Sequence, residues 1–224
     1  MAERRSPGQR AGLSRERVLD AALAIVDRDG LAALTMRRLG GELGVEAMTI
    51  YHHLPGKDAL LDGLVERVLD LASPPQPQQR TPDRAWDASM RDYAVTLRRT
   101  LRAHPGVLPI AVTRPAATPR TLRLVESSLA LLRAAGFPLG LALDLFNALT
   151  VFVIGHVAAE VATEPVNERG AAGSTEYLAG LDATEFPLLT EAATLGEGTD
   201  DQARFGTALD AFLLGFAALR DAAA

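Results

Sequence analysis

Apolar residues recur at intervals of three and four along most of this chain of 224 residues. Val18, Ala22 and Ile25 show the pattern near the start, and Phe205 and Leu209 show it near the end. That spacing places apolar side chains on one face of an α-helix. No stretch shows the sustained alternation that a half-buried strand requires. The sequence therefore predicts an all-α fold.

Glycine and proline divide the chain into a series of predicted helices. We expect helices over residues 14–29, 35–43, 46–53, 57–72, 82–103, 115–135, 138–163 and 203–219, a short apolar piece over 107–112, and a loop over 164–202 with one short helix around 175–181. The proline-rich polar stretch 73–77 is unsuited to helix. It places a boundary between a domain of residues 1–70 and a larger helical domain of residues 71–224.

Composition excludes the classes of protein that depend on cysteine, and the distribution of charge bears on nucleic-acid binding. The chain has no cysteine, which excludes disulfide scaffolds, thiolate metal sites and cysteine nucleophiles. The net charge of −5 argues at first against nucleic acid. Residues 1–67, however, hold 10 basic and 10 acidic side chains, so the negative charge lies in the remainder. The first residues, with five arginines and three acids in residues 1–20, form a basic arm.

Neither the N-terminal residues nor the most apolar stretch of the chain indicates export or a membrane span. The N-terminal residues MAERRSPGQRAG lack the apolar core of a secretory signal. The most apolar stretch, 137–159, contains Pro138, Asp144, Asn147 and His156, which are too many polar groups for a comfortable span. We expect a buried helix there, no membrane partner and a cytoplasmic protein.

Residues 35–53 contain two short helical runs separated by Gly44, and an amphipathic helix precedes them. This order is typical of a helix-turn-helix. Leu39 and Ile50 can form the inner face of the pair, while the outer positions of the second run suit a DNA major groove. Lys57, the only lysine in the chain, begins the next helix, where its ammonium and the backbone N–H groups can meet a phosphate.

Residues 13–68 resemble the DNA-binding domain of the TetR family of bacterial repressors. The resemblance lies in VLDAAL at 18–23, GLAALT at 30–35, LGGELGV at 39–45 and TIYHHLPGKDAL at 49–60. It implies phosphate contacts from Thr35, Tyr51 and Lys57. It also implies that Arg37 reaches a base edge or the backbone.

The same resemblance places Ala47, Met48, Thr49 and His52 toward the groove. Ala47 and Met48 stand where tetracycline-repressor-like members often carry a polar base reader. Here they offer only apolar contact, for example to a thymine methyl.

Other interpretations of this segment stay open. Tyr51 could instead close the core of the three-helix unit, and Lys57 could be an ordinary surface lysine. His52 and His53 point about 100° apart on a helix, so they cannot share one metal ion. We expect Arg38 to face solvent or to pair within the protein.

The second domain carries a weaker resemblance to the effector domain of the tetracycline-repressor branch, through Trp86, Thr113-Arg114-Pro115 and Gly136-Phe137. The resemblance implies a homodimer through helices 138–163 and 203–219, with Gly155 and Gly215 allowing close approach. It also implies a small-molecule pocket lined by Tyr93, Leu97, Phe146, Asn147 and Thr150. Asn147 and Thr150 share a helix face, and they could equally satisfy one another in a core.

In that branch, the tetracycline binders hold magnesium through a histidine three residues before the Thr-Arg-Pro. Ile110 stands at that position here, and Ala159 stands where an acidic partner is expected. We therefore expect no metal, no cofactor, and an apolar or aromatic effector.

The chain also lacks the common catalytic motifs, including G-x-S-x-G, the P-loop and HExxH, so we expect no enzyme. Together these features predict a ligand-responsive repressor that binds a palindromic double-stranded DNA operator as a dimer. A transcriptional activator, or a ligand-independent DNA-binding adaptor of the same fold, remains open.

Overall fold

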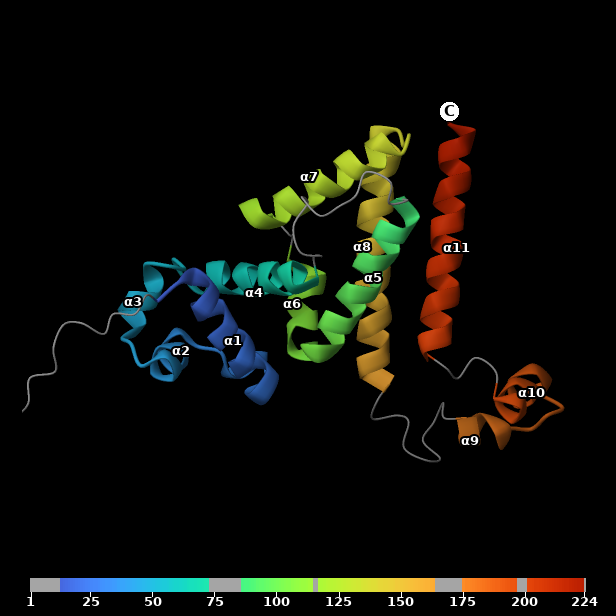
Figure 1. Ribbon diagram of the computed structural model, residues 1–224. Helices are drawn as coiled ribbons and strands as arrows, with labels where there is room; N and C mark the ends of the chain where they lie inside the picture. The colour runs from blue at the N-terminus through green and yellow to red at the C-terminus, as the bar shows by residue number, and fades with distance from the viewer. Residues whose placement is uncertain (1–12, 73–85, 115–116, 164–174, 197–200, 224) are drawn as a thin grey trace, which may run out of the picture. The chain divides into compact units, whose positions relative to one another are not determined.

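The computed structural model describes residues 13–72, 86–114, 117–163, 175–196 and 201–223, which contain helices and no strand (Figure 1). The all-α prediction is confirmed. The described residues form two compact units. Of the described residues, the first unit comprises 13–72, 103–114 and 117–123, and the second comprises 86–102 and those from 124 onward. Residues 103–123 thus pack with the first unit, beyond the boundary expected from the proline-rich stretch.

Helix boundaries in the first unit follow the residues that predicted them. Helix α1 (Arg15–Asp29) begins after Ser14, whose hydroxyl accepts a backbone hydrogen bond in the first turn. It ends at Gly30, whose φ of 79° lies in the region that favours glycine. The single 3₁₀ turn η1 (Leu31–Ala33) then leads into α2 (Met36–Leu43).

The turn after α2 sets the direction of the next helix. Gly44 adopts the left-handed conformation, with φ 66°, and the N–H of Val45 donates to the carbonyl of Gly40 at 2.9 Å. Helix α3 (Ala47–Tyr51) follows after one further residue, and α4 (Lys57–Ala72) begins the next long run. This is the helix-turn-helix that the two short runs predicted.

An apolar core joins α1 to α4. Its members have no measurable exposure and lie on the inner face of each helix: Val18, Ile25, Leu34, Leu39, Ile50, Leu60 and Leu64. The core fixes how α3 is presented, because Ile50 is buried within it while the rest of that short helix stays near the surface.

Residues 103–123 add a short covering segment to this unit. The 3₁₀ turn η3 (Pro105–Val107) and helix α6 (Leu108–Thr113) correspond to the predicted apolar piece. His104 lies at the end of the preceding helix, and its Nδ1 is 2.8 Å from Asp27 Oδ2 of α1. That contact ties the segment to the first helix.

The second unit is built on long helices. These are α5 (Trp86–Ala103) up to residue 102, α7 (Pro119–Ala134) from residue 124, α8 (Leu139–Thr163) and α11 (Asp201–Ala222). Helices α8 and α11 lie side by side (Figure 1), and the ring of Phe152 stacks 5.5 Å from Phe205 and 6.1 Å from Phe212.

Helix α8 is buried on one side only. Leu145, Leu149 and Val153 have no measurable exposure, whereas Val151 is 68% exposed. Residues 139–162 are long and apolar enough to cross a membrane, a test that core and interface helices of soluble proteins also pass. The prediction of a buried helix is therefore correct for one face of α8, and its other face is exposed.

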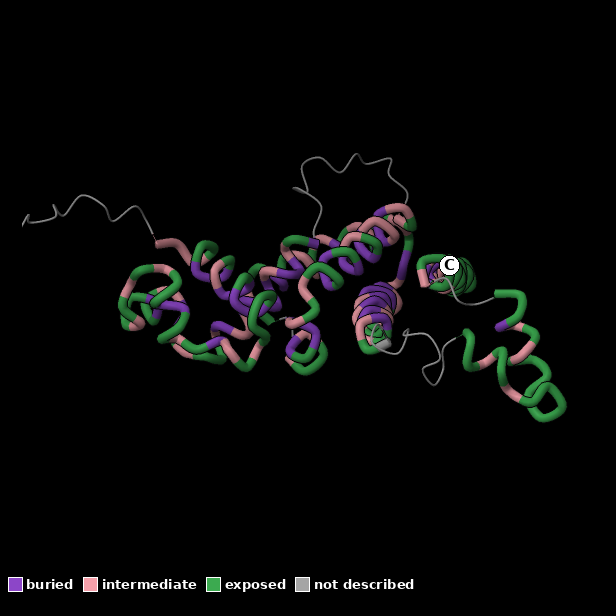
Figure 2. Tube along the Cα trace, turned by 90° about the horizontal axis from the view of Figure 1, so that it is seen from below, coloured by how far each residue is buried: buried purple, intermediate pink, exposed green. Residues whose placement is uncertain are grey.

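Two short helices occupy part of the expected loop. Helix α9 (Thr175–Ala179) matches the predicted short helix, and α10 (Pro187–Leu195) was not predicted. Pro187 at its first position and the left-handed Gly196 after its end are sequence signals that could have revealed α10. Most residues of both helices are exposed (Figure 2).

Candidate DNA-binding and effector sites

Helix α3 presents the residues predicted to face a groove. Met48 is 71% exposed and Tyr51 is 44% exposed, and Thr49 and His52 are exposed beside them. Ala47 is half-buried at the start of the helix. Since Tyr51 lies at the surface, it is not an aromatic closing the core.

Thr35, Arg37 and Lys57 lie at or near helix starts in the same unit. The Thr35 hydroxyl accepts a hydrogen bond from the backbone N–H of Arg38 at 3.1 Å, and its own proton remains to be donated. Arg37 and Lys57 are both exposed. Lys57 is the first residue of the 16-residue α4, whose first backbone N–H groups have no partner within the helix. This is the arrangement that a phosphate requires.

Ion pairs hold the helices behind this surface together. Arg28 of α1 donates to both carboxylate oxygens of Glu42, at 3.1 and 3.3 Å. The hydrogen bonds from Arg28 lower the pKa of Glu42 below its ordinary value. Arg38 reaches Asp29 at 2.5 Å, as expected for an arginine paired within the protein. Of the neighbouring arginines 37 and 38, only Arg37 has no ion pair within the described residues.

The acidic groups next to Lys57 are paired with Arg114, the residue that follows α6. Arg114 lies 2.6 Å from Asp58 and 2.7 Å from Asp62 on α4. These two carboxylates raise the pKa of the Arg114 guanidinium. Because Asp58 is paired in this way, the phosphate expected at Lys57 meets less repulsion at the start of α4.

Three of the five residues predicted for the effector pocket, Tyr93, Phe146 and Thr150, contact one another in the second unit. Tyr93 and Leu97 of α5 are buried, and so is Phe146 of α8. The Tyr93 and Phe146 rings stack at 5.3 Å, and the Tyr93 hydroxyl lies 3.1 Å from the Thr150 hydroxyl. Asn147, 100° around the helix from Phe146, is exposed and lies outside this cluster.

The hydrogen-bond order within the cluster follows from its contacts. Thr150 donates to the Phe146 carbonyl at 2.9 Å, so Tyr93 is the donor to Thr150. Burial raises the pKa of Tyr93 to about 12. The phenol is therefore neutral at physiological pH and offers one fixed polar group in an apolar wall, as small-molecule sites do.

Two protein-family models match the chain. The model described as "Bacterial regulatory proteins, tetR family" matches residues 18–64, and "Tetracyclin repressor-like, C-terminal domain" matches residues 76–220. The chain belongs to the TetR family. It is a helix-turn-helix transcriptional regulator, and the family is not one of enzymes.

Relatives of known name agree with this TetR-family assignment along almost the whole chain. An HTH-type transcriptional regulator of Saccharopolyspora erythraea is 32% identical over 92% of this chain and 85% of its own length. The class D tetracycline repressor protein of Escherichia coli is 31% identical over 92% of this chain and 90% of its own length. The structure of the Streptomyces coelicolor TetR family protein ActR in complex with actinorhodin matches this one with a TM-score of 0.75 and 32% sequence identity. The match covers 94% of this chain and 99% of ActR.

The positions that would hold magnesium in tetracycline-binding TetR proteins do not suit a metal here. Ile110 is an apolar buried residue, and Ala159 carries no ligand atom. Among the residues that the structure describes, no group of three histidine, aspartate or glutamate side chains could hold an ion.

A buried polar cluster in the second unit was not predicted. Arg98 of α5 donates from Nε to both carboxylate oxygens of Glu160, at 3.2 Å each, and a further nitrogen bonds Gln202 of α11. His156 Nε2 lies 3.4 Å from Glu160. The signal that could have found the cluster is the spacing of His156 and Glu160, four residues apart on one face of an otherwise apolar helix.

Proposed function

We propose that the protein is a cytoplasmic repressor that binds a palindromic operator as a homodimer and releases it when a small molecule binds. The observation that carries the proposal is the exposed outer face of α3, held by the core through Ile50, with Lys57 at the start of the next long helix. A short helix presented in this way fits a major groove, and the adjacent basic and N–H groups fit the flanking phosphates.

The apolar surfaces of two long helices support a dimer. Val151 of α8 is 68% exposed and Leu214 of α11 is 71% exposed. Gly155 and Gly215 lie on the same helices with open space around them, which leaves room for a second backbone. A second copy of the chain, related by a two-fold axis, would cover the exposed apolar side chains of both helices.

The cluster of Tyr93, Phe146 and Thr150 supports a largely apolar or aromatic effector. Its rings offer stacking surfaces, and its phenol and hydroxyl offer few polar contacts. ActR, which has been crystallised with actinorhodin, is a relative of this kind.

The function is best tested by selecting operator sequences in vitro with the full-length protein and then screening small molecules for release of that DNA. We expect a two-fold symmetric selected sequence whose half-sites are one helical turn apart or a multiple of it. Failure to enrich any sequence would contradict the proposal. A footprint upstream of the promoter that increases transcription would indicate an activator instead.

Removing the Lys57 ammonium should weaken binding to all DNA sequences by a similar factor. We expect Lys57→Ala to reduce the slope of log affinity against log salt by about one per protomer, because one phosphate contact is lost. A salt titration on operator and on unrelated DNA measures both effects. Arg99→Ala, which removes an exposed charge from α5, is the matched control and should leave the slope unchanged.

Met48 should read a thymine methyl. Deoxyuridine at the thymine that faces Met48 removes only that methyl, and we expect an affinity loss of about fourfold for each half-site changed. Met48→Ala should abolish most of this difference and change the selected sequence more than the overall affinity. An equal loss in both proteins would show that Met48 does not contact the methyl.

Changing Phe146 should alter the response to effector and spare the operator. Phe146→Leu keeps an apolar side chain but removes the ring that stacks on Tyr93. We expect the effector concentration for half-release to rise about three- to tenfold. Operator affinity without effector, measured by fluorescence anisotropy, should match that of the unaltered protein. A parallel change in operator affinity would place Phe146 outside the effector site.

A further inference from the structure

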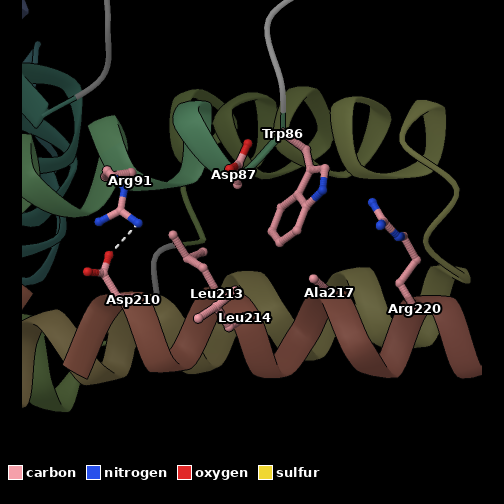
Figure 3. Close-up of a pocket in the computed structure, with 8 residues that line it drawn as sticks. All are labelled: Trp86, Asp87, Arg91, Asp210, Leu213, Leu214, Ala217 and Arg220. Atoms are coloured by element: carbon pink, nitrogen blue, oxygen red, sulfur yellow. Dashed lines mark ion pairs between the residues drawn. The ribbon is translucent and has the colours of Figure 1, made fainter. Parts of the chain in front are cut away.

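The second unit contains an open pocket of about 450 Å³ between the start of α5 and the second half of α11 (Figure 3). This volume lies within the range of small-molecule sites. The pocket is lined by α5 and α11, whereas the Tyr93 cluster lies between α5 and α8. It is therefore a separate feature from the proposed effector site.

One wall of the pocket is aromatic. Figure 3 shows the indole of Trp86 extending from α5 toward α11, above Leu213 and Ala217. Phe137 packs edge-on against this indole with the ring centroids 4.7 Å apart, which fixes the ring in place. A fixed indole beside aliphatic side chains is a surface on which a planar ring can stack.

Two arginines, Arg91 and Arg220, line the pocket, and of these Arg220 is the one that lies against the aromatic wall. Arg220 lies at one end, with its guanidinium carbon 5.7 Å from the Trp86 ring centre and 5.4 Å from that of Phe137. The two rings hold it in place. Its Nε and one terminal nitrogen lie 2.9 and 2.7 Å from the same carboxylate oxygen of Asp221, the next residue along the chain. Asp221 is exposed, and an exposed pair of this kind is weak, so a ligand carboxylate can use the free edge of the guanidinium or replace Asp221.

The other charges at the pocket balance one another or point away from the aromatic wall. Arg91 and Asp210 form an ion pair of 2.5 Å at the opposite end, as the dashed line in Figure 3 marks. Asp87 is exposed at the rim, and its carboxylate points away from α11 in the same view. Arg220 thus sets the charge preference of the cavity, and Asp87 opposes it at longer range.

We propose that this pocket binds a planar aromatic molecule that carries a carboxylate. The ring lies against Trp86, and the carboxylate accepts hydrogen bonds from the planar guanidinium of Arg220, whose fork matches it. The site is separate from the Tyr93 cluster, and its Leu214 also belongs to the apolar surface proposed for the dimer.

The test uses the full-length protein without DNA and 4-nitrobenzoate as the probe. Trp86 is the only tryptophan in the chain, so quenching of its fluorescence by the nitroaromatic ring reports binding at this wall. The neutral control is 4-nitrobenzyl alcohol, which has the same ring and needs the same absorbance correction. We expect the carboxylate to bind at least about tenfold more tightly, as for a hydrogen bond to a charged group.

Matched variants locate the carboxylate. Arg220→Gln should reduce the affinity for 4-nitrobenzoate about tenfold, and Asp87→Asn should increase it a few-fold. Arg204→Gln removes a charge from an exposed part of the same helix and should have no effect. If Arg220→Gln proves unstable, two measurements still test the proposal: the affinity of Asp87→Asn for 4-nitrobenzoate, and the ratio of the affinities of the unaltered protein for the acid and the alcohol.

Three results would overturn the inference: equal binding of acid and alcohol, no quenching at millimolar probe, or unchanged affinity in a folded Arg220→Gln. Binding that weakens as the protein concentration rises would also overturn it, because a second copy would then fill the pocket. Failure of operator selection would overturn the proposed function and leave this inference untouched.

Discussion

Replacing Gly40 with alanine should destabilise the helix-turn-helix, whereas the same change at the neighbouring Gly41 should not. A Cβ on Gly40 would lie 2.8 Å from the Val45 carbonyl oxygen and 3.2 Å from the Ala47 nitrogen, which are both backbone atoms. The turn into α3 would have to move to accept it. We expect the free energy of unfolding to fall by about 2 kcal/mol, as for other overpacked sites.

The matched control is Gly41→Ala. Gly41 is exposed, and a Cβ added to it would have no neighbouring atom within 4 Å, so alanine there should stabilise α2 by up to about 1 kcal/mol. Urea unfolding at one fixed protein concentration measures both variants. Equal stability of the two would show that the turn accommodates a methyl group.

Gly40→Ala should also weaken operator binding by about tenfold or more, because α3 begins directly after the displaced turn and misplaced base contacts are costly. Gly41→Ala should keep full operator affinity. Measuring binding well below the unfolding midpoint separates this effect from loss of folded protein. Undiminished operator binding by folded Gly40→Ala would show that the position of α3 does not depend on this contact.

This pair of glycines shows what sequence could and could not predict. Helix boundaries were predictable because they depend on local residues, such as the Ser14 cap and the left-handed Gly44. No local pattern distinguishes Gly40 from Gly41. Only the fold brings the Val45 carbonyl against one and not the other.

The candidate sites divide in the same way. The resemblance to the family implied that Met48 faces outward, and Met48 is exposed while Ile50 on the same short helix is buried. For Asn147, the resemblance to a family suggested a ligand contact, and the local period could not say which neighbours α8 would meet. The Trp86 pocket depends on residues more than 120 positions apart, so no local pattern indicates it.

The buried pair of Arg98 and Glu160 should give the other large effect on stability. Both residues are less than a tenth exposed, and Arg98 is also held by Gln202 and by the Phe205 ring, 4.8 Å from its guanidinium carbon. Glu160→Leu would leave the guanidinium buried without a counter-charge. We expect the free energy of unfolding to fall by about 3–5 kcal/mol.

Arg98→Met should cost less than Glu160→Leu, because Glu160 keeps Arg102 at 3.9 Å and His156 at 3.4 Å as neighbours. In the double variant, the introduced methionine can pack on Phe205 and no buried charge is left unpaired. The double variant should therefore be more stable than Glu160→Leu alone, with a coupling free energy of about 2–3 kcal/mol. Urea unfolding of all four proteins at one concentration gives this value. Additive losses would show instead that the two side chains stabilise the second unit separately, through packing and not through their charges.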